Sequence, residues 1–207
     1  MTRAVRQTNI APDKSQDAPR PFTDFAGQAN IVLLGDPGAG KTHLFTEAAA
    51  AEQARFITAR AFLNTPAAML QGQALFIDGL DEKRTGRGDR GTVDELVVKL
   101  FAVDPPKVRI SCRAADWLGK SDLAAFRPFF EQRGETFVLH LESLSRPEQV
   151  AVLALQRVDT DAAEAFLSQA EERGLGDFLE NPQNLILLWR AVQTGSWPDT
   201  RKELFEA

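Results

Sequence analysis

The sequence has little of what marks secreted, membrane or nucleic-acid-binding proteins. Its single cysteine, Cys112, excludes an internal disulfide and fits a reducing compartment. No apolar run approaches the roughly 20 residues that a membrane-spanning helix needs, and residues 1–21 hold no apolar stretch suited to a signal peptide. The formal net charge of −5 gives no basic field that would attract nucleic acid. We therefore expect a cytoplasmic protein with no membrane segment and no direct nucleic-acid signal.

What the sequence does contain fits one globular α/β domain followed by a small satellite. With 43% hydrophobic and 26% charged residues, the composition is that of an ordinary soluble fold. Residues 1–21 are polar and include Pro12, Pro19 and Pro21, so we expect a flexible N-terminal tail. Residues 22–141 are expected to form the core domain, because strand and helix patterns alternate from residue 30 onward.

Five short apolar segments predict the strands of this core. They are residues 30–34, 55–59, 74–78, 108–112 and 136–141. Between them, residues 41–54 are rich in alanine and residues 92–101 are amphipathic, as is typical of helices. Strands that alternate with helices imply a parallel sheet covered on both faces. We therefore predict a three-layer α/β sandwich with a five-stranded parallel sheet.

After Leu141 the pattern becomes entirely helical, so residues 142–207 are predicted to form a small helical subdomain. Ser145 and Glu148 have the spacing of a capping box, and a later helix is opened by Pro182. The last helical pattern starts near residue 200 and stops after about two turns, which makes a marginal helix on its own. We expect this subdomain to be truncated and the chain to be the front of a longer protein.

Residues 35–42 read GDPGAGKT and match the phosphate-loop pattern G-x-x-x-x-G-K-[ST]. Glycines let the loop turn its N–H groups inward, and the helix that follows points its positive end at the same place. Lys41 could reach the β- and γ-phosphates, and the Thr42 hydroxyl could bind Mg²⁺. The candidate nucleotide-binding residues here are Gly35, Asp36, Pro37, Gly38, Ala39, Gly40, Lys41, Thr42 and His43. Of these, His43 has no visible partner in the sequence and fits a packing or surface residue better than a catalyst.

Three acidic residues follow the predicted strand at residues 74–78. Asp78 ends that strand at the sheet edge where α/β proteins bind ligands, so it is a candidate Mg²⁺ ligand opposite Thr42. Asp81 and Glu82 come three and four residues later, where a carboxylate could orient the attacking water. The sequence does not rank Asp81 against Glu82.

These strings resemble the NACHT-like branch of the STAND class of P-loop NTPases, which is related to AAA+ proteins and belongs to the ASCE group. "LFIDGLDE", residues 75–82, resembles the family's extended Walker B motif. Arg113 at the end of "VRISCR" is similar to the family's sensor arginine, which reads the γ-phosphate. "ENPQNLILL" resembles the helical-domain motif whose proline, here Pro182, packs against the base. The segment at residues 195–207 is similar to the one that follows in the family.

The resemblance implies that the sensor strand lies between the Walker A and Walker B strands and that residues 142–207 are a helical lid. It implies ATP and ADP as ligands with Mg²⁺, slow ATP hydrolysis, and a switch that self-associates in its ATP state. Such proteins continue into winged-helix and sensing domains, so missing C-terminal domains or a protein partner would complete the switch. In a bacterium this points to defence signalling.

Several alternatives stay open. Arg113 could instead form an ion pair with Asp116. One of the arginines of the loop at residues 83–91, Arg84, Arg87 or Arg90, could act across a subunit interface as an arginine finger. The main alternative function is an AAA+-type remodelling ATPase that acts on a protein or DNA partner. A small-molecule kinase is a third, although the apolar amphipathic helices after residue 142 do not suit its arginine-rich lid.

Overall fold

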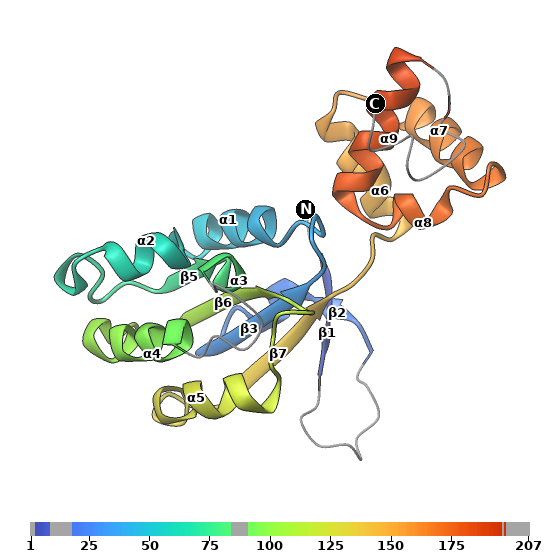
Figure 1. Cartoon of the computed structure of the whole chain (residues 1–207). Helices are drawn as coiled ribbons and strands as arrows, with labels where there is room; N and C mark the ends of the chain where they lie inside the picture. Colours follow the sequence, from blue (N-terminus) through green and yellow to red (C-terminus); the bar gives the residue numbers. More distant parts are fainter. Residues whose placement is uncertain (1–2, 9–17, 84–90, 196, 198–207) are drawn as a thin grey trace. The chain divides into compact units, whose positions relative to one another are not determined.

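The computed structural model describes residues 3–8, 18–83, 91–195 and 197 of the chain (Figure 1). The chain falls into two compact units: residues 2–37 and 41–142 form the first, and residues 143–207 form the second, with which Gly38–Gly40 are grouped. The first unit contains a β-sheet with helices, and the elements described from Ser143 onward are all helices.

The sheet of the first unit has seven strands. They are β1 (Ala4–Gln7), β2 (Arg20–Pro21), β3 (Asn30–Gly35), β4 (Arg55–Thr58), β5 (Leu75–Asp78), β6 (Val108–Arg113) and β7 (Thr136–Leu141). Their order is β2-β1-β7-β3-β6-β5-β4, and the five strands from β7 to β4 are all parallel. The predicted five-stranded parallel sheet is therefore confirmed. Strand β6 lies between β3 and β5, which is the order that the family resemblance implies.

The N-terminal segment corrects one prediction. Residues Ala4–Gln7 and Arg20–Pro21 are strands of the sheet and not parts of a flexible tail. Strand β1 pairs antiparallel with β7, with Val5 opposite Leu141, and the Val5 side chain is buried. The backbone bonds to β7 and the burial of one valine fix this strand. The backbone pairing depends on a strand more than 130 residues away, and the burial of Val5 depends on a cluster of residues outside β1, so a four-residue pattern does not reveal either.

Alternation along the strands directs side chains to two buried faces, because successive strand residues point to opposite sides. Val32 and Leu34 lie on the face covered by α4 (Gly91–Val103) and α5 (Lys120–Phe130). Ile31 and Leu33 lie on the face covered by α1 (Lys41–Ala51). Figure 1 shows the sheet between these helices, so the unit has the predicted three layers.

Short helical segments complete the first unit. They are η1 (Phe22–Phe25), α2 (Ala59–Asn64), η2 (Ala67–Met69) and α3 (Leu80–Lys83). Of these, α3 begins two residues after Asp78 and carries both Asp81 and Glu82 beside the carboxyl end of β5.

The second unit is helical, as predicted. Its helices are α6 (Arg146–Leu155), α7 (Thr160–Glu172), α8 (Gly176–Leu179) and α9 (Pro182–Thr194). The predicted capping box is present at the start of α6, where the Ser145 N–H donates to the Glu148 carboxylate over 2.8 Å. The helix predicted near residue 200 lies outside the described residues. In the part of the chain that the structure describes, no helix is long and apolar enough to cross a membrane.

Candidate nucleotide-binding site

The loop between β3 and α1 has the backbone that the phosphate-loop pattern predicts. Strand β3 ends at Gly35 and helix α1 begins at Lys41. Gly38 and Gly40 have φ angles of +73° and +93°, in the left-handed region that glycine adopts without steric cost. These two glycines therefore let the loop reverse direction directly above the end of a buried strand.

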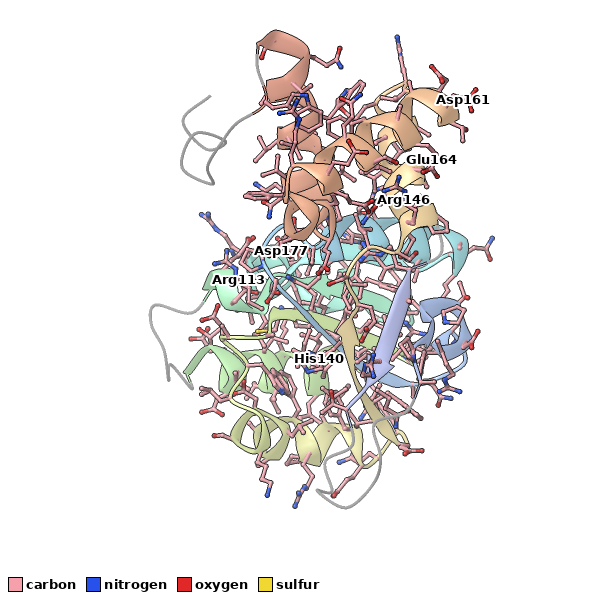
Figure 2. The ribbon with its side chains drawn as sticks, turned by 90° about the vertical axis from the view of Figure 1, so that its right-hand side faces the viewer. Arg113, His140, Arg146, Asp161, Glu164 and Asp177 are labelled. Carbon is pink, nitrogen blue, oxygen red and sulfur yellow. The ribbon has the colours of Figure 1, made fainter. Side chains whose placement is uncertain are left out.

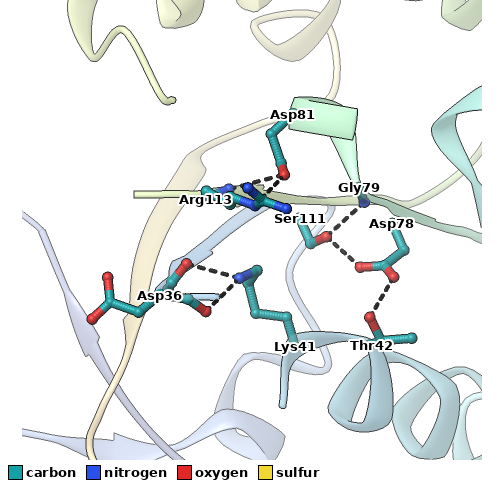
Figure 3. Close-up of polar contacts among 9 residues, drawn as sticks. Asp36, Lys41, Thr42, Asp78, Gly79, Asp81, Ser111 and Arg113 are labelled. Carbon is teal, nitrogen blue, oxygen red and sulfur yellow. Dashed lines mark hydrogen bonds and ion pairs between the residues drawn. The ribbon is translucent and has the colours of Figure 1, made fainter. Parts of the chain in front are cut away.

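Lys41 lies folded over this loop (Figure 3). Its ammonium donates to the backbone carbonyls of Gly35 at 2.7 Å and Asp36 at 2.9 Å. Burial lowers the pKa of Lys41, and the negative charges of Asp81 and Asp78 oppose that shift. The carboxylates thus support the charged form of an ammonium that the loop removes from much of the solvent.

Asp78 is the centre of a network of buried and partly buried hydrogen bonds (Figure 3). Its Oδ2 accepts from the Thr42 hydroxyl at 2.7 Å, and its Oδ1 accepts from the Ser111 hydroxyl. Ser111 in turn accepts a hydrogen bond from the Gly79 N–H at 2.9 Å. Thr42 and Asp78 are predicted from the sequence, whereas Ser111 is not among the predicted residues. The available signal was alternation along β6, which puts Ser111 on the same face as Arg113, two residues later.

Asp81 and Arg113 form a second, adjacent network. The Asp81 carboxylate accepts the backbone N–H of Arg113 at 3.0 Å and forms an ion pair with its Nε at 2.8 Å. The Asp81 side chain is only 6% exposed, whereas that of Arg113 is 47% exposed. The sequence suggests that Arg113 contacts a phosphate or pairs with Asp116, and it does not predict the pairing with Asp81. The pair joins the end of β6 to helix α3.

Glu82 stands apart from this pairing. It is exposed, and within the described part of the chain its carboxylate forms no hydrogen bond or ion pair. It lies close to Gly79, where an added Cβ would come within 3.1 Å of the Glu82 carboxyl carbon. Gly79 also has φ of +75°. The backbone conformation therefore favours glycine after Asp78, whereas the Glu82 carboxylate is the end of an exposed, flexible side chain that could move to admit a Cβ.

The remaining candidate residues do not join these networks. His43 is on the surface of α1 and lies 3.3 Å from Glu47, one turn along the same helix. Pro182 opens α9 in the second unit, and its contact with a nucleotide base stays a prediction. Asp36 and Pro37 are exposed in the loop, which Ala39 completes. Arg84, Arg87 and Arg90 lie outside the described residues.

Comparison with known proteins identifies the fold but no family. The sequence matches no family model and no curated protein. AMPPCP-bound DnaA from Aquifex aeolicus has a similar structure, with a TM-score of 0.52 and 15% identity over 89% of this chain and 63% of that one. For the RuvB Holliday junction branch migration motor of Thermotoga maritima, the TM-score is 0.47 and the sequence identity is 20%, over 86% of this chain and 60% of that one. The chain therefore spans less than two thirds of either protein. The chain has the P-loop NTPase fold, which it shares with DnaA.

Proposed function

We propose that this chain binds ATP and ADP with Mg²⁺, hydrolyses ATP slowly, and acts as a nucleotide-dependent switch of the NACHT-like STAND type. One observation carries the proposal. Lys41 and Thr42 of the loop lie beside two carboxylate networks at the carboxyl edge of the sheet, where α/β proteins bind ligands. The likeness to DnaA, whose structure holds an ATP analogue, gives the fold in which such a site occurs.

The loop would hold the phosphates. Gly38 and Gly40 give it the reversed backbone that turns N–H groups inward, and the start of α1 adds the positive end of a helix. The Lys41 ammonium would exchange its bonds with the loop carbonyls for bonds to the β- and γ-phosphates. Asp78 and Asp81 favour the positive charge on Lys41, and binding of the negatively charged phosphates needs that positive charge.

The donors beside the loop fit Mg²⁺. The Thr42 hydroxyl and the Asp78 carboxylate lie 2.7 Å apart and are oxygen donors, which Mg²⁺ prefers. Few protein ligands are expected for Mg²⁺, because phosphates and water supply the rest. When bound, the ion would neutralise negative charge on the phosphates.

The contacts of Asp81 and Glu82 favour Glu82 as the residue that orients water. Asp81 is buried and committed to Arg113, whereas Glu82 is exposed and has no such bond among the described residues. We assign Glu82 the role of accepting the proton of the attacking water. Asp81 would instead aim the Arg113 guanidinium, which would stabilise charge on the γ-phosphate.

Two features support a switch: the "DGLDE" resemblance, and Arg113, which Asp81 of the same chain holds in an ion pair. Further domains, self-association or a protein partner would convert the nucleotide state into a signal, for which bacterial defence is our proposal. Adenine selectivity would come from Pro182 and its surroundings. A remodelling ATPase is the competing function, and turnover separates the two, since a motor cycles repeatedly while a switch holds its nucleotide.

The test is steady-state ATP turnover of four chains: wild type, Lys41→Ala, Glu82→Gln and Glu131→Gln. Glu131 is a matched control because it is an exposed glutamate paired with Arg127 on α5. We expect slow Mg²⁺-dependent turnover in the wild type and in Glu131→Gln. Lys41→Ala should lose nucleotide binding, and Glu82→Gln should bind ATP but hydrolyse it at least about a hundredfold more slowly.

Two results would contradict the proposal. Rapid multiple turnover with freely exchanging nucleotide would favour a remodelling motor over a switch. Unchanged nucleotide binding in Lys41→Ala would remove the loop from the site and with it the ATPase assignment.

A further inference from the structure

A cavity of about 290 Å³ lies in the first unit, on the face of the sheet covered by α5. Its residues come from the sheet, from α5, from the segment between β6 and α5, and from Thr8, which follows β1. Leu34 and Val138 belong to β3 and β7, Leu123 and Lys120 belong to α5, and Trp117 belongs to the segment between β6 and α5. His140 on β7 (Figure 2) completes the lining, since it lies next to Leu34 in the register of the two strands.

The lining is apolar with a rigid aromatic border. Leu34 and Val138 are buried core residues, and Leu123 packs against the same core. The Trp117 ring stacks on Phe126 with the ring centres 6.4 Å apart and an interplanar angle of 17°. This stacking fixes the indole, so the cavity presents a flat ring that favours a second ring in offset or edge contact.

The polar groups of the cavity favour a negative charge on the ligand. Lys120 is the first residue of α5, an eleven-residue helix whose N-terminal positive potential is partly offset by Asp122 in its first turn. None of the described residues that line the cavity carries a carboxylate. In the described part of the chain, Lys120 forms no ion pair and the His140 imidazole forms no hydrogen bond, so both side chains can bind a ligand. The negative charges of Glu142 and Asp36 act on His140, so Lys120 is the side chain that favours a negative charge on the ligand. Burial lowers the pKa of His140, which keeps the imidazole neutral and able to donate or accept.

We propose that this cavity binds a small planar aromatic ligand with one negative charge, on the sheet face opposite α1. The ring would lie against Trp117 and the aliphatic floor, with its charged group toward Lys120 and a polar atom toward His140. Two lining residues are sequence neighbours of the proposed phosphate site. Leu34 directly precedes Gly35, and Ala114 directly follows Arg113. A ligand there would contact residues adjacent to Gly35 and Arg113 and act as an effector of the phosphate site, an inference that rests on the proposed function.

Binding is tested with indole-3-acetate and its uncharged analogue indole-3-acetamide, titrated into the full chain without nucleotide. We expect saturable binding of the acetate, tighter than the amide by about fivefold, the size of a partly exposed ion pair. Lys120→Gln should remove this preference. Arg127→Gln, which removes an exposed positive charge from the same helix outside the cavity lining, should keep it. Leu123→Trp should fill the cavity and abolish binding.

No saturable binding, or binding that persists unchanged in Leu123→Trp and Lys120→Gln, would overturn the site. The effector role is tested by the affinity for ADP and Mg²⁺ with and without saturating indole-3-acetate, where we expect a change of roughly fivefold. An identical ADP affinity would overturn the effector role. Failure of ADP to bind even without the probe would count against the proposed function and not against the cavity, because probe binding is measured separately.

Discussion

Replacing Ser111 by alanine tests how the Asp78 carboxylate is held. The Ser111 side chain is fully buried, so water cannot readily replace its hydroxyl. The substitution removes a hydrogen bond to a carboxylate, worth about 1.5–3 kcal/mol, and one from the Gly79 N–H, worth about 0.5–1.5 kcal/mol. We expect the free energy of unfolding to fall by about 2–4 kcal/mol.

The same change should weaken Mg²⁺ binding more than nucleotide binding. Figure 3 shows two side chains that donate to Asp78, Thr42 and Ser111. After the substitution Thr42 alone of these two would remain, so the Asp78 carboxylate would be less well oriented. Loss of such a supporting hydrogen bond typically costs about ten- to a hundredfold in metal affinity. The assay is ADP binding titrated with Mg²⁺, beside urea unfolding. ADP binding without Mg²⁺ should be unchanged.

Two variants control this experiment. Ser111→Thr keeps the hydroxyl and should retain the Mg²⁺ dependence of the wild type. Ser121→Ala makes the same chemical change on α5, where the hydroxyl has no bond among the described residues, and should alter stability by less than about 0.5 kcal/mol. A Ser111→Ala chain with wild-type Mg²⁺ dependence would refute the role of Ser111 in orienting Asp78.

Three further predictions follow from single contacts. Asp81→Asn and Arg113→Gln should each slow ATP hydrolysis, and the double variant should be no slower than the worse single one, because the residues act as a pair; additive losses would separate their roles. Gly79→Ala should lower the free energy of unfolding by about 1–2 kcal/mol at its positive φ, measured by urea titration, and an unchanged midpoint would disprove the strain. The hydrogen bond from Arg6 lowers the pKa of Glu142, so its contribution to stability is full above the ordinary value of 4.5 and is lost as the pH falls through the lower folded value. Glu142→Gln should therefore reduce the urea midpoint at pH 7 and converge with the wild type in acid, whereas a deficit that persists in acid would contradict the linkage.

The sequence predicted the parallel part of the sheet because buried strands leave a local signal. Residues 30–34 and 136–141 are short apolar runs bounded by polar segments, and they became β3 and β7 with little change in their limits. The antiparallel edge was missed for a physical reason. Residues Ala4–Gln7 include one buried apolar side chain, Val5, and are held by the backbone of β7.

The site was predicted where residue type and spacing carry the chemistry. Thr42 and Asp78 follow from the loop pattern and from a carboxylate at a strand end, and the structure brings them into contact. Ser111 has no comparable signal, since a serine in a strand is usually a packing residue. The partner of Arg113 was not predictable either, because Asp81 comes 32 residues earlier and meets it only when α3 lies beside β6.

We propose that this chain is a switch whose state is set by the nucleotide that it retains. The exchange rate of its bound nucleotide tests this most directly. The chain would be purified, the nucleotide that accompanies it identified, and its release followed after addition of excess fluorescent ADP with Mg²⁺. We predict ADP at close to one per chain, released slowly compared with ATP turnover in motor ATPases, and absent from Lys41→Ala. Purification without nucleotide, or release on the scale of seconds with rapid ATP turnover, would contradict the switch.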